Sequence, residues 1–254
     1  MGTSGNRQVV FKQFTVHDDR CGMKVGTDAL LLGAWADVAR CQNVCDIGAG
    51  SGIVTLMLAQ RAKQAQIASV EIERQAYEQC IENVRSSPFS NRIEVHLESI
   101  QHYANQSIHQ GQYDAVVSNP PFFHGKPKSP YPERNLARHD DALSLSDLLN
   151  AAKRLLKSDG SFSLIWPVER ESELDEMAQR QGLSCKRKCT IHGRNDLPPV
   201  RFLSEWFVPS GESKISLTLE KLIIEEGERA LGQPLLSARY KELLNDFVLD
   251  WPVC

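Results

Sequence analysis

From about residue 43 onward, short apolar runs typical of β-strands alternate with segments whose apolar residues recur with helical periodicity. This alternation indicates βαβ units, in which parallel strands form a central sheet and helices cover it. In such a sheet, functional side chains gather beyond the carboxyl ends of the strands. The sequence therefore predicts an α/β fold whose functional residues lie in the loops that follow the strands.

The expected elements follow from this pattern. Strands are predicted at residues 43–47, 67–71, 92–97, 113–118 and 161–166, and helices at residues 53–60, 77–84, 146–157 and 235–249. A further helix includes Leu174 and stops at Gly182, and Asp159-Gly160 is expected to end the helix at 146–157. Residues 201–208 and 214–220 flank the turn Pro209-Ser210-Gly211, which predicts an antiparallel strand pair near the C-terminus.

The composition limits the class of protein. With 254 residues and 41% hydrophobic content the chain can bury one sizeable core, so we expect a single domain over residues 1–254. The 29 basic and 32 acidic residues give a net charge of −3, which excludes a uniformly basic surface for nucleic acid. Residues 1–6 carry no apolar leader and no apolar run is long enough for a membrane span, so we expect a soluble cytoplasmic protein.

The seven cysteines show no compact disulfide framework, which fits a reducing compartment. Cys185, Cys189 and His192 have a spacing seen in metal sites, but they lack a convincing fourth ligand. We therefore expect no bound metal. The basic residues 186–188, together with Arg194, are either a solvated charged face or a contact for phosphates.

A glycine-rich segment, Asp46-Ile47-Gly48-Ala49-Gly50-Ser51-Gly52, follows the first predicted strand of the alternating region and opens a helix. Its glycines let the backbone turn tightly and approach a ligand where a Cβ would collide. Gly48, Gly50 and Gly52 are therefore predicted to bind a nucleotide-like cofactor. Dinucleotide oxidoreductases use a similar loop with the spacing G-x-G-x-x-G, so a nucleotide-binding oxidoreductase is one alternative.

Two acidic residues at strand ends indicate which cofactor fits. Asp46 would repel a pyrophosphate but suits the ammonium group of S-adenosylmethionine, directly or through water. Glu71 ends the second of these strands, 25 positions later, and can accept hydrogen bonds from both ribose hydroxyls. The alternative is that Asp46 only caps the next helix and Glu71 faces solvent. The pattern favours S-adenosylmethionine as the cofactor.

The motif Asn119-Pro120-Pro121-Phe122 follows the predicted strand at 113–118, and its prolines stop the sheet and fix the backbone direction. The Asn119 side-chain carbonyl and the Pro120 backbone carbonyl can accept both hydrogens of an amino group conjugated to a ring or an amide. Its lone pair then turns toward a methyl donor, while Phe122 offers a stacking face for a planar substrate. We predict that Asn119, Pro120 and Phe122 are catalytic and that Asn119 also contacts the cofactor; an ordinary Asn-Pro turn with a buried Phe is the alternative.

With these motifs, the chain resembles the class I, Rossmann-like amino methyltransferases over about residues 20–220. The resemblance implies a mostly parallel seven-stranded sheet with helices on both faces. The upstream segment from Met23 to Trp35 further resembles the bacterial tRNA1(Val) adenine-N6 methyltransferase family. That family modifies adenine 37, which adjoins the anticodon, so the resemblance implies a valine tRNA partner engaged at its anticodon loop.

The resemblance also implies roles for the N-terminal part of the chain. The Lys-x-Gly-Thr-Asp segment of that family packs over the cofactor, which points to Lys24, Thr27 and Asp28. An extension of about residues 1–40 then covers the cofactor site, and about residues 221–254 form a C-terminal tail. Related proteins generally offer an acid to the cofactor's adenine after the third strand, whereas Ser99 stands there in this sequence. We expect Ser99 to make that contact.

Basic residues follow the Asn-Pro-Pro motif and are expected to contact RNA phosphates: Lys126, Lys128, Arg134 and Arg138. An Asn-Pro-Pro-aromatic motif also serves enzymes that methylate guanine N2 in rRNA or a glutamine amide in release factors, so these acceptors are alternatives. A noncatalytic cofactor-binding module is a further alternative, which the intact motif disfavours.

Overall fold

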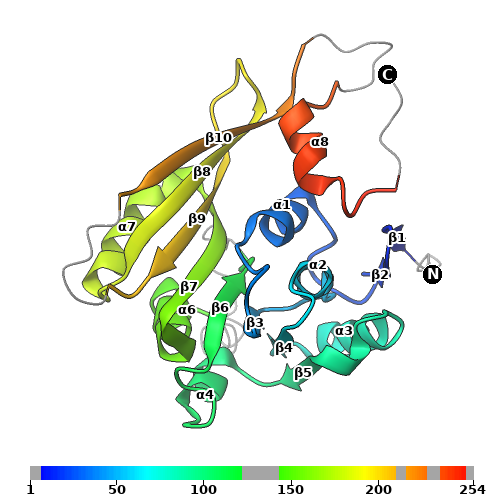
Figure 1. Ribbon diagram of the computed structural model, residues 1–254, viewed down its shortest axis with the longest axis vertical. Coiled ribbons are helices and arrows are strands. Elements are labelled where there is room, and N and C mark those ends of the chain that lie inside the picture. Colours follow the sequence, from blue (N-terminus) through cyan, green and yellow to red (C-terminus); the bar gives the residue numbers. More distant parts are fainter. Residues whose placement is uncertain (1–6, 122–142, 210–215, 228–234, 250–254) are drawn as a thin grey trace, which may run out of the picture.

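The computed structural model describes residues 7–121, 143–209, 216–227 and 235–249 (Figure 1). The strands are β1 (Gln8–Val10), β2 (Thr15–His17), β3 (Asn43–Ile47), β4 (Gln66–Glu71), β5 (Ile93–Leu97), β6 (Tyr113–Ser118), β7 (Leu156–Pro167), β8 (Ser184–Arg194), β9 (Arg201–Phe207) and β10 (Thr218–Glu225). The helices are α1 (Thr27–Trp35), α2 (Ile53–Arg61), α3 (Arg74–Arg85), α4 (Ile100–Asn105), α6 (Leu145–Leu155), α7 (Glu171–Arg180) and α8 (Ala238–Leu244), with single 3₁₀ turns at Ser90–Arg92 and Val168–Arg170.

Eight strands form the main sheet in the order β10-β8-β9-β7-β6-β3-β4-β5, and β1 pairs with β2 in a separate antiparallel pair. The five strands from β7 to β5 in this order are parallel to their neighbours, apart from the antiparallel contact between β7 and β9. The predicted α/β, mostly parallel fold is therefore confirmed. The main sheet has eight strands among the described residues, one more than the seven expected.

Helices lie on both sides of the main sheet (Figure 1), and each side has its own apolar core cluster. One core cluster draws on α1, α2, α3 and α8, and the other draws on α4, α6 and α7, so helices cover both faces. The helix α6 shows why such segments form: Ser144 accepts the amide hydrogen of Asp147 as an N-cap, and the buried side chains recur on one face. None of the described helices combines the length and apolarity needed to cross a lipid bilayer.

The predicted strand pair near the C-terminus is wrong in its pairing. β9 is antiparallel to β7 and β8, so the expected antiparallel character is present, but β10 pairs with β8 in parallel and does not contact β9 as a ladder partner. β9 occupies the position between β7 and β8 and has no free edge for β10. β9 and β10 are therefore not the two strands of a hairpin.

The end of α6 also differs from expectation. The helix ends at Leu155 and β7 begins immediately at Leu156, which pairs with Tyr113, so Asp159-Gly160 lies inside the strand and does not end the helix. A Cβ at Gly160 would lie 2.9 Å from the Tyr113 carbonyl oxygen. The glycine is thus needed for close approach of two strands at an irregular register.

The basic residues 186–188 lie on β8, a strand that the sequence pattern does not predict. Lys188 is buried, and its Nζ is 2.6 Å from Glu171 Oε1 and 3.1 Å from Asp175 Oδ2 on α7. Its neighbours Lys186 and Arg187 both pair with Glu205 of β9. All three basic side chains therefore form ion pairs with carboxylates of β9 or α7.

Glu205 is the buried centre of that group. Its side chain is 1% exposed, and its two carboxylate oxygens each lie 2.8 Å from a cation, Lys186 Nζ and Arg187 Nη2. Arg187 also donates to the Trp35 carbonyl oxygen and lies over the Trp35 ring, 3.7 Å from its centroid. The carboxylate thus fixes the side chain that joins β8 to the end of α1.

Replacing Glu205 with alanine should reduce the free energy of unfolding by about 2–3 kcal/mol, because the hydrogen bonds that Lys186 and Arg187 donate to a buried carboxylate are lost. The control is Glu173→Ala, which removes a more exposed carboxylate paired with Arg170 and should cost less than about 1 kcal/mol. Urea denaturation at neutral pH measures both. Equal losses in the two variants would contradict the role of Glu205.

Candidate active site

The candidate active site lies at the carboxyl edge of the main sheet, where β3 stands between β4 and β6. In the parallel register Ile47 is opposite Val70 of β4 and Ser118 of β6. The glycine loop after β3, Glu71 at the end of β4 and Asn119 after β6 therefore emerge from adjacent strands. Strand order reverses at this point, and open α/β sheets bind ligands in the crevice beyond such a reversal.

The glycine loop has the backbone that the sequence predicts. Gly48, Gly50 and Gly52 have φ angles of 74°, 55° and 80°, a region that favours glycine. A Cβ at Gly52 would lie 2.8 Å from the Cys80 Sγ, whereas a Cβ at Gly48 or Gly50 would meet no described atom within 4 Å. Gly52 is thus required by packing, whereas Gly48 and Gly50 border open space.

Glu71 is buried and fixed beside this loop. Its Oε2 accepts from the Gly50 amide and its Oε1 from the Glu73 amide, both at 2.8 Å. Each carboxylate oxygen keeps a second lone pair for a ligand hydroxyl. The interpretation of Glu71 as a solvent-facing acid is therefore wrong, and its predicted contact with ribose stays a prediction.

Asp46 is buried beneath the loop. Its Oδ2 accepts from the Thr55 hydroxyl at 2.6 Å, and Thr55 is 2.9 Å from the Ser69 hydroxyl. Burial raises the pKa of Asp46 to about 7, the hydrogen bond from Thr55 opposes that rise, and the negative charge of Glu71 adds to it. A cationic ligand group near Asp46 would relieve this unfavourable charge.

Asn119 has an acceptor without a partner. Its Oδ1 is buried and has no hydrogen-bond partner among the described residues. The preceding residue is fixed, because the Ser118 hydroxyl donates to the Ile47 carbonyl oxygen at 2.9 Å. Pro120 is buried, while Phe122 lies outside the described residues. A buried carbonyl oxygen without a hydrogen-bond partner at this edge can accept a hydrogen bond from a substrate.

The segment before α1 is tied together by Lys24. Its Nζ donates to the carbonyl oxygens of Asp18, Asp19 and Cys21 at 2.7, 3.0 and 3.0 Å. Burial and then the charge of Glu71 raise the pKa of Cys21 to about 11. Asn83 Nδ2 donates to the carbonyl oxygens of both His17 and Ser51, which places the N-terminal segment close to the glycine loop. Lys24 therefore shapes the segment internally, and its contact with a cofactor stays a prediction.

Thr27 and Asp28 begin α1. Thr27 is exposed, and the Asp28 carboxylate is 3.1 Å from the Arg201 Nε at the start of β9. Ser99 follows β5 and caps α4 by accepting from the His102 amide at 3.2 Å. The structure thus gives Asp28 and Ser99 local partners, and their contacts with a cofactor, like that of Thr27, stay predictions.

The four predicted RNA contacts, Lys126, Lys128, Arg134 and Arg138, lie outside the described residues. Two other residues at this edge escape the motif-based predictions. Ile72 follows Glu71 and exposes 52% of its surface, and the buried Asn83 of α3 contacts the glycine loop. The position of Ile72, directly after an acidic residue at a strand end, is a sequence signal by which it could have been predicted. No local sequence pattern marks Asn83 as a site residue.

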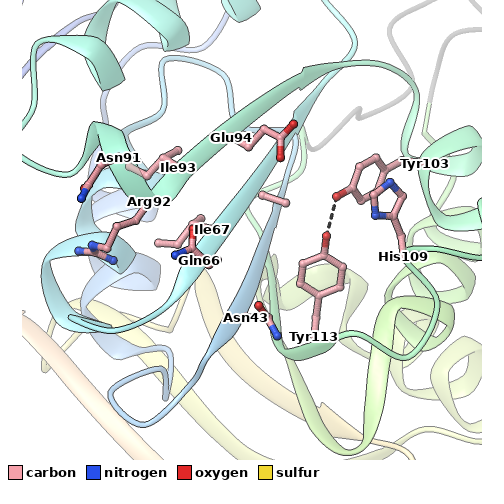
Figure 2. Close-up of a pocket in the computed structure, with 11 residues that line it drawn as sticks. Asn43, Gln66, Ile67, Asn91, Arg92, Ile93, Glu94, Tyr103, His109 and Tyr113 are labelled. Carbon is pink, nitrogen blue, oxygen red and sulfur yellow. Dashed lines mark hydrogen bonds between the residues drawn. The ribbon is translucent and has the colours of Figure 1, made fainter.

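A separate hollow of about 380 Å³ lies at the opposite edge of the sheet (Figure 2). It is bordered by the first residues of β3, β4, β5 and β6, and Tyr103 and Tyr113 form a hydroxyl pair there at 2.5 Å. The predicted site residues that the structure describes do not line it. Within the described ranges, no group of three or more His, Cys, Asp or Glu side chains is arranged to hold a metal ion.

Comparison with known proteins agrees with this geometry. The family model described as "Methyltransferase small domain" matches residues 21–180. A tRNA1(Val) (adenine(37)-N6)-methyltransferase of Trichodesmium erythraeum is 41% identical over 97% of this chain and 100% of its own. One of the same name from Parabacteroides distasonis is 45% identical over 83% of this chain and 88% of its own.

Among solved structures, a predicted O-methyltransferase from Agrobacterium tumefaciens superimposes with a TM-score of 0.65 at 23% identity, covering 87% of this chain and 96% of that one, which shows a shared fold. The sheet, the glycine loop and the Asn-Pro-Pro turn on the neighbouring strand define a methyltransferase of class I. Within that class, the chain belongs to the bacterial tRNA1(Val) (adenine(37)-N6)-methyltransferase family.

The Asp46 carboxyl should destabilise the ligand-free fold above neutral pH. Its pKa of about 7 in the folded protein lies above the ordinary aspartate value of 3.8, so the folded state binds more protons between these pH values and stability falls as pH rises through that window. Asp46→Asn should therefore have a higher Tm than the unmodified protein at pH 8, with a smaller difference at pH 5. Differential scanning calorimetry measures this.

The control for that experiment is Asp159→Asn at an exposed position of β7, which should leave the Tm unchanged at both pH values. The Tm difference between Asp46→Asn and the unmodified protein is compared at the two pH values. If the gain in Tm is smaller at pH 8 than at pH 5, the ionised buried carboxylate does not destabilise the fold.

Proposed function

We propose that this chain transfers a methyl group from S-adenosylmethionine to N6 of adenine 37 in tRNA1(Val). The observation that carries the proposal is that Asn119 Oδ1, beside the glycine loop, has no hydrogen-bond partner among the described residues. This oxygen can therefore accept a hydrogen bond from an amino group. The relatives at 41% and 45% identity are named for methylation of this same adenine, which supports the proposal. A tRNA substrate implies work in the cytoplasm.

The residues of the crevice fit S-adenosylmethionine. The open space at Gly48 and Gly50 admits a ligand against the backbone, and Glu71 is held where it can accept from ribose hydroxyls. Asp46 suits the ammonium group, because a nearby cation stabilises its buried ionised form. The exposed Ile72 beside Glu71 offers an apolar surface to the adenine ring, with Ser99 as the expected polar contact.

The N-terminal extension completes this site in the proposal. Lys24 holds three carbonyl groups of the segment that precedes α1, and this gives that segment a fixed backbone shape. Thr27 and Asp28 begin the helix that continues from the segment. We therefore treat the whole chain as one methyltransferase domain in which about residues 1–40 cover the cofactor.

In the proposed mechanism the enzyme acts mainly by aligning the acceptor nitrogen with the methyl group. The sulfonium of the cofactor supplies an activated methyl group, so the enzyme needs little acid–base catalysis. Asn119 Oδ1 and the Pro120 carbonyl oxygen accept the two hydrogens of the adenine amino group, which directs its lone pair toward the methyl carbon. These acceptors also stabilise the positive charge that develops on the nitrogen. Phe122 is proposed to stack on the base.

Substrate RNA is proposed to lie over the segment after the Asn-Pro-Pro turn. With a net charge of −3, the chain depends on local cations for phosphate contacts. The basic residues 186–188 are engaged in ion pairs within the fold. The cations that we propose for the phosphate contacts are Lys126, Lys128, Arg134 and Arg138.

Replacing Asn119 with alanine should lower kcat/KM for tRNA by about 10²–10³, since an orienting and charge-stabilising acceptor is removed. The affinity for S-adenosylmethionine should change little. Steady-state methylation assays and calorimetry measure the two effects. The control is Asn91→Ala at the opposite edge of the sheet, and an Asn119→Ala enzyme as active as this control would refute the mechanism.

The protein is incubated with radiolabelled S-adenosylmethionine and, in parallel assays, with intact tRNA1(Val), its isolated anticodon stem-loop, duplex DNA or a release factor. We expect label in the intact tRNA, as N6-methyladenosine. An anticodon-loop base is unpaired and enters a pocket at low cost. Activity should fall as salt rises and with charge removal at Lys126 or Arg134. Nucleoside analysis by mass spectrometry identifies the product, and N2-methylguanosine, or label only on protein or DNA, rules the proposal out.

A further inference from the structure

Asn83 is a polar side chain on the buried face of α3, where it is 1% exposed. Its neighbours on that face include the apolar Ala76, Cys80 and Val84. A buried amide is costly unless its donors and acceptor are satisfied, so its partners indicate why it stands there.

The partners of Asn83 belong to two different segments of the chain. Its Oδ1 accepts from the His17 amide at 3.0 Å, and its Nδ2 donates to the His17 carbonyl oxygen at 2.7 Å. The same Nδ2 donates to the Ser51 carbonyl oxygen at 2.8 Å. One side chain therefore joins β2 of the N-terminal extension to the glycine loop.

The contact at Ser51 acts on the part of the loop that borders the ligand space. Ser51 stands between Gly50, whose amide donates to Glu71, and Gly52, which packs on Cys80. Cys80 and Asn83 lie one turn apart on α3, so the helix holds the loop at two adjacent points. Rotation of the Ser51 peptide would alter the amide directions on both sides of it.

We propose that Asn83 is a positioning residue for the methyl-transfer reaction, which sets the glycine loop for S-adenosylmethionine and couples it to the N-terminal extension. The inference rests on the cofactor part of the proposed function. Asn83 touches neither donor nor acceptor in this role. It acts through the Ser51 carbonyl on one side and through both backbone groups of His17 on the other.

Gln79 provides a matched control. It lies on the same helix, is 2% exposed and accepts from the Arg20 Nε at 3.2 Å. It therefore contacts the N-terminal extension but has no hydrogen bond to the glycine loop. Comparing alanine at the two positions separates loss of a buried amide from loss of loop positioning.

Calorimetric titration with S-adenosylhomocysteine is the primary test, because it needs no RNA. Asn83→Ala should raise its Kd by about tenfold, as expected for lost hydrogen bonds that shape a site. Gln79→Ala should stay within about twofold of the unmodified protein, although both variants lose an amide and lower the Tm. In methylation assays Asn83→Ala should raise KM for S-adenosylmethionine and leave kcat at saturation nearly unchanged.

Equal Kd values for Asn83→Ala and the unmodified protein, or equal increases in both variants, would overturn the inference. If the unmodified protein itself binds no S-adenosylhomocysteine, the proposed function fails instead. Should Asn83→Ala not fold, hydrogen exchange of the unmodified protein decides: bound S-adenosylhomocysteine should slow exchange of the His17 amide, and unchanged exchange would refute the coupling.

Discussion

The parallel register of β3 with β4 on one side and β6 on the other is the constraint on which the active site depends. It brings the ends of three strands, far apart in sequence, to one edge, so that the glycine loop, Glu71 and Asn119 need only short connections to meet. A slip of one residue in either ladder would turn every side chain of a strand to the opposite face. The apolar core clusters on both sides of the sheet oppose such a slip.

Polar groups under this edge give the site a defined shape. Asp46, Thr55 and Ser69 form a buried chain of hydrogen bonds, and Glu71 receives two backbone amides. Buried polar groups of this kind rigidify a structure when they are satisfied. Asp46 is the member whose burial is only partly compensated, which is consistent with a site that is completed by a cationic ligand.

The sequence predicts most of the sheet and much of the site, for physical reasons that differ between elements. β3 and β6 are short, mostly apolar runs that are buried along nearly their whole length, and their predicted limits agree with the structure. β8 escapes prediction because its charges are neutralised by distant carboxylates such as Glu205 and Asp175. The pairing of β10 and the role of Asn83 are not predicted either. Strand order, and hydrogen bonds from a side chain to distant backbone groups, leave no local pattern in the sequence.

The position of β9 has a consequence for synthesis of the chain. β9 fills the place between β7 and β8, so β8 cannot join the main sheet until residues 201–207 have emerged from the ribosome. Until then residues 161–167 of β7 present unpaired backbone amide and carbonyl groups that are able to pair with other chains. The nascent protein is therefore most prone to aggregation after β7 is complete and before β9 closes that edge, an interval of about 40 residues and a few seconds of translation.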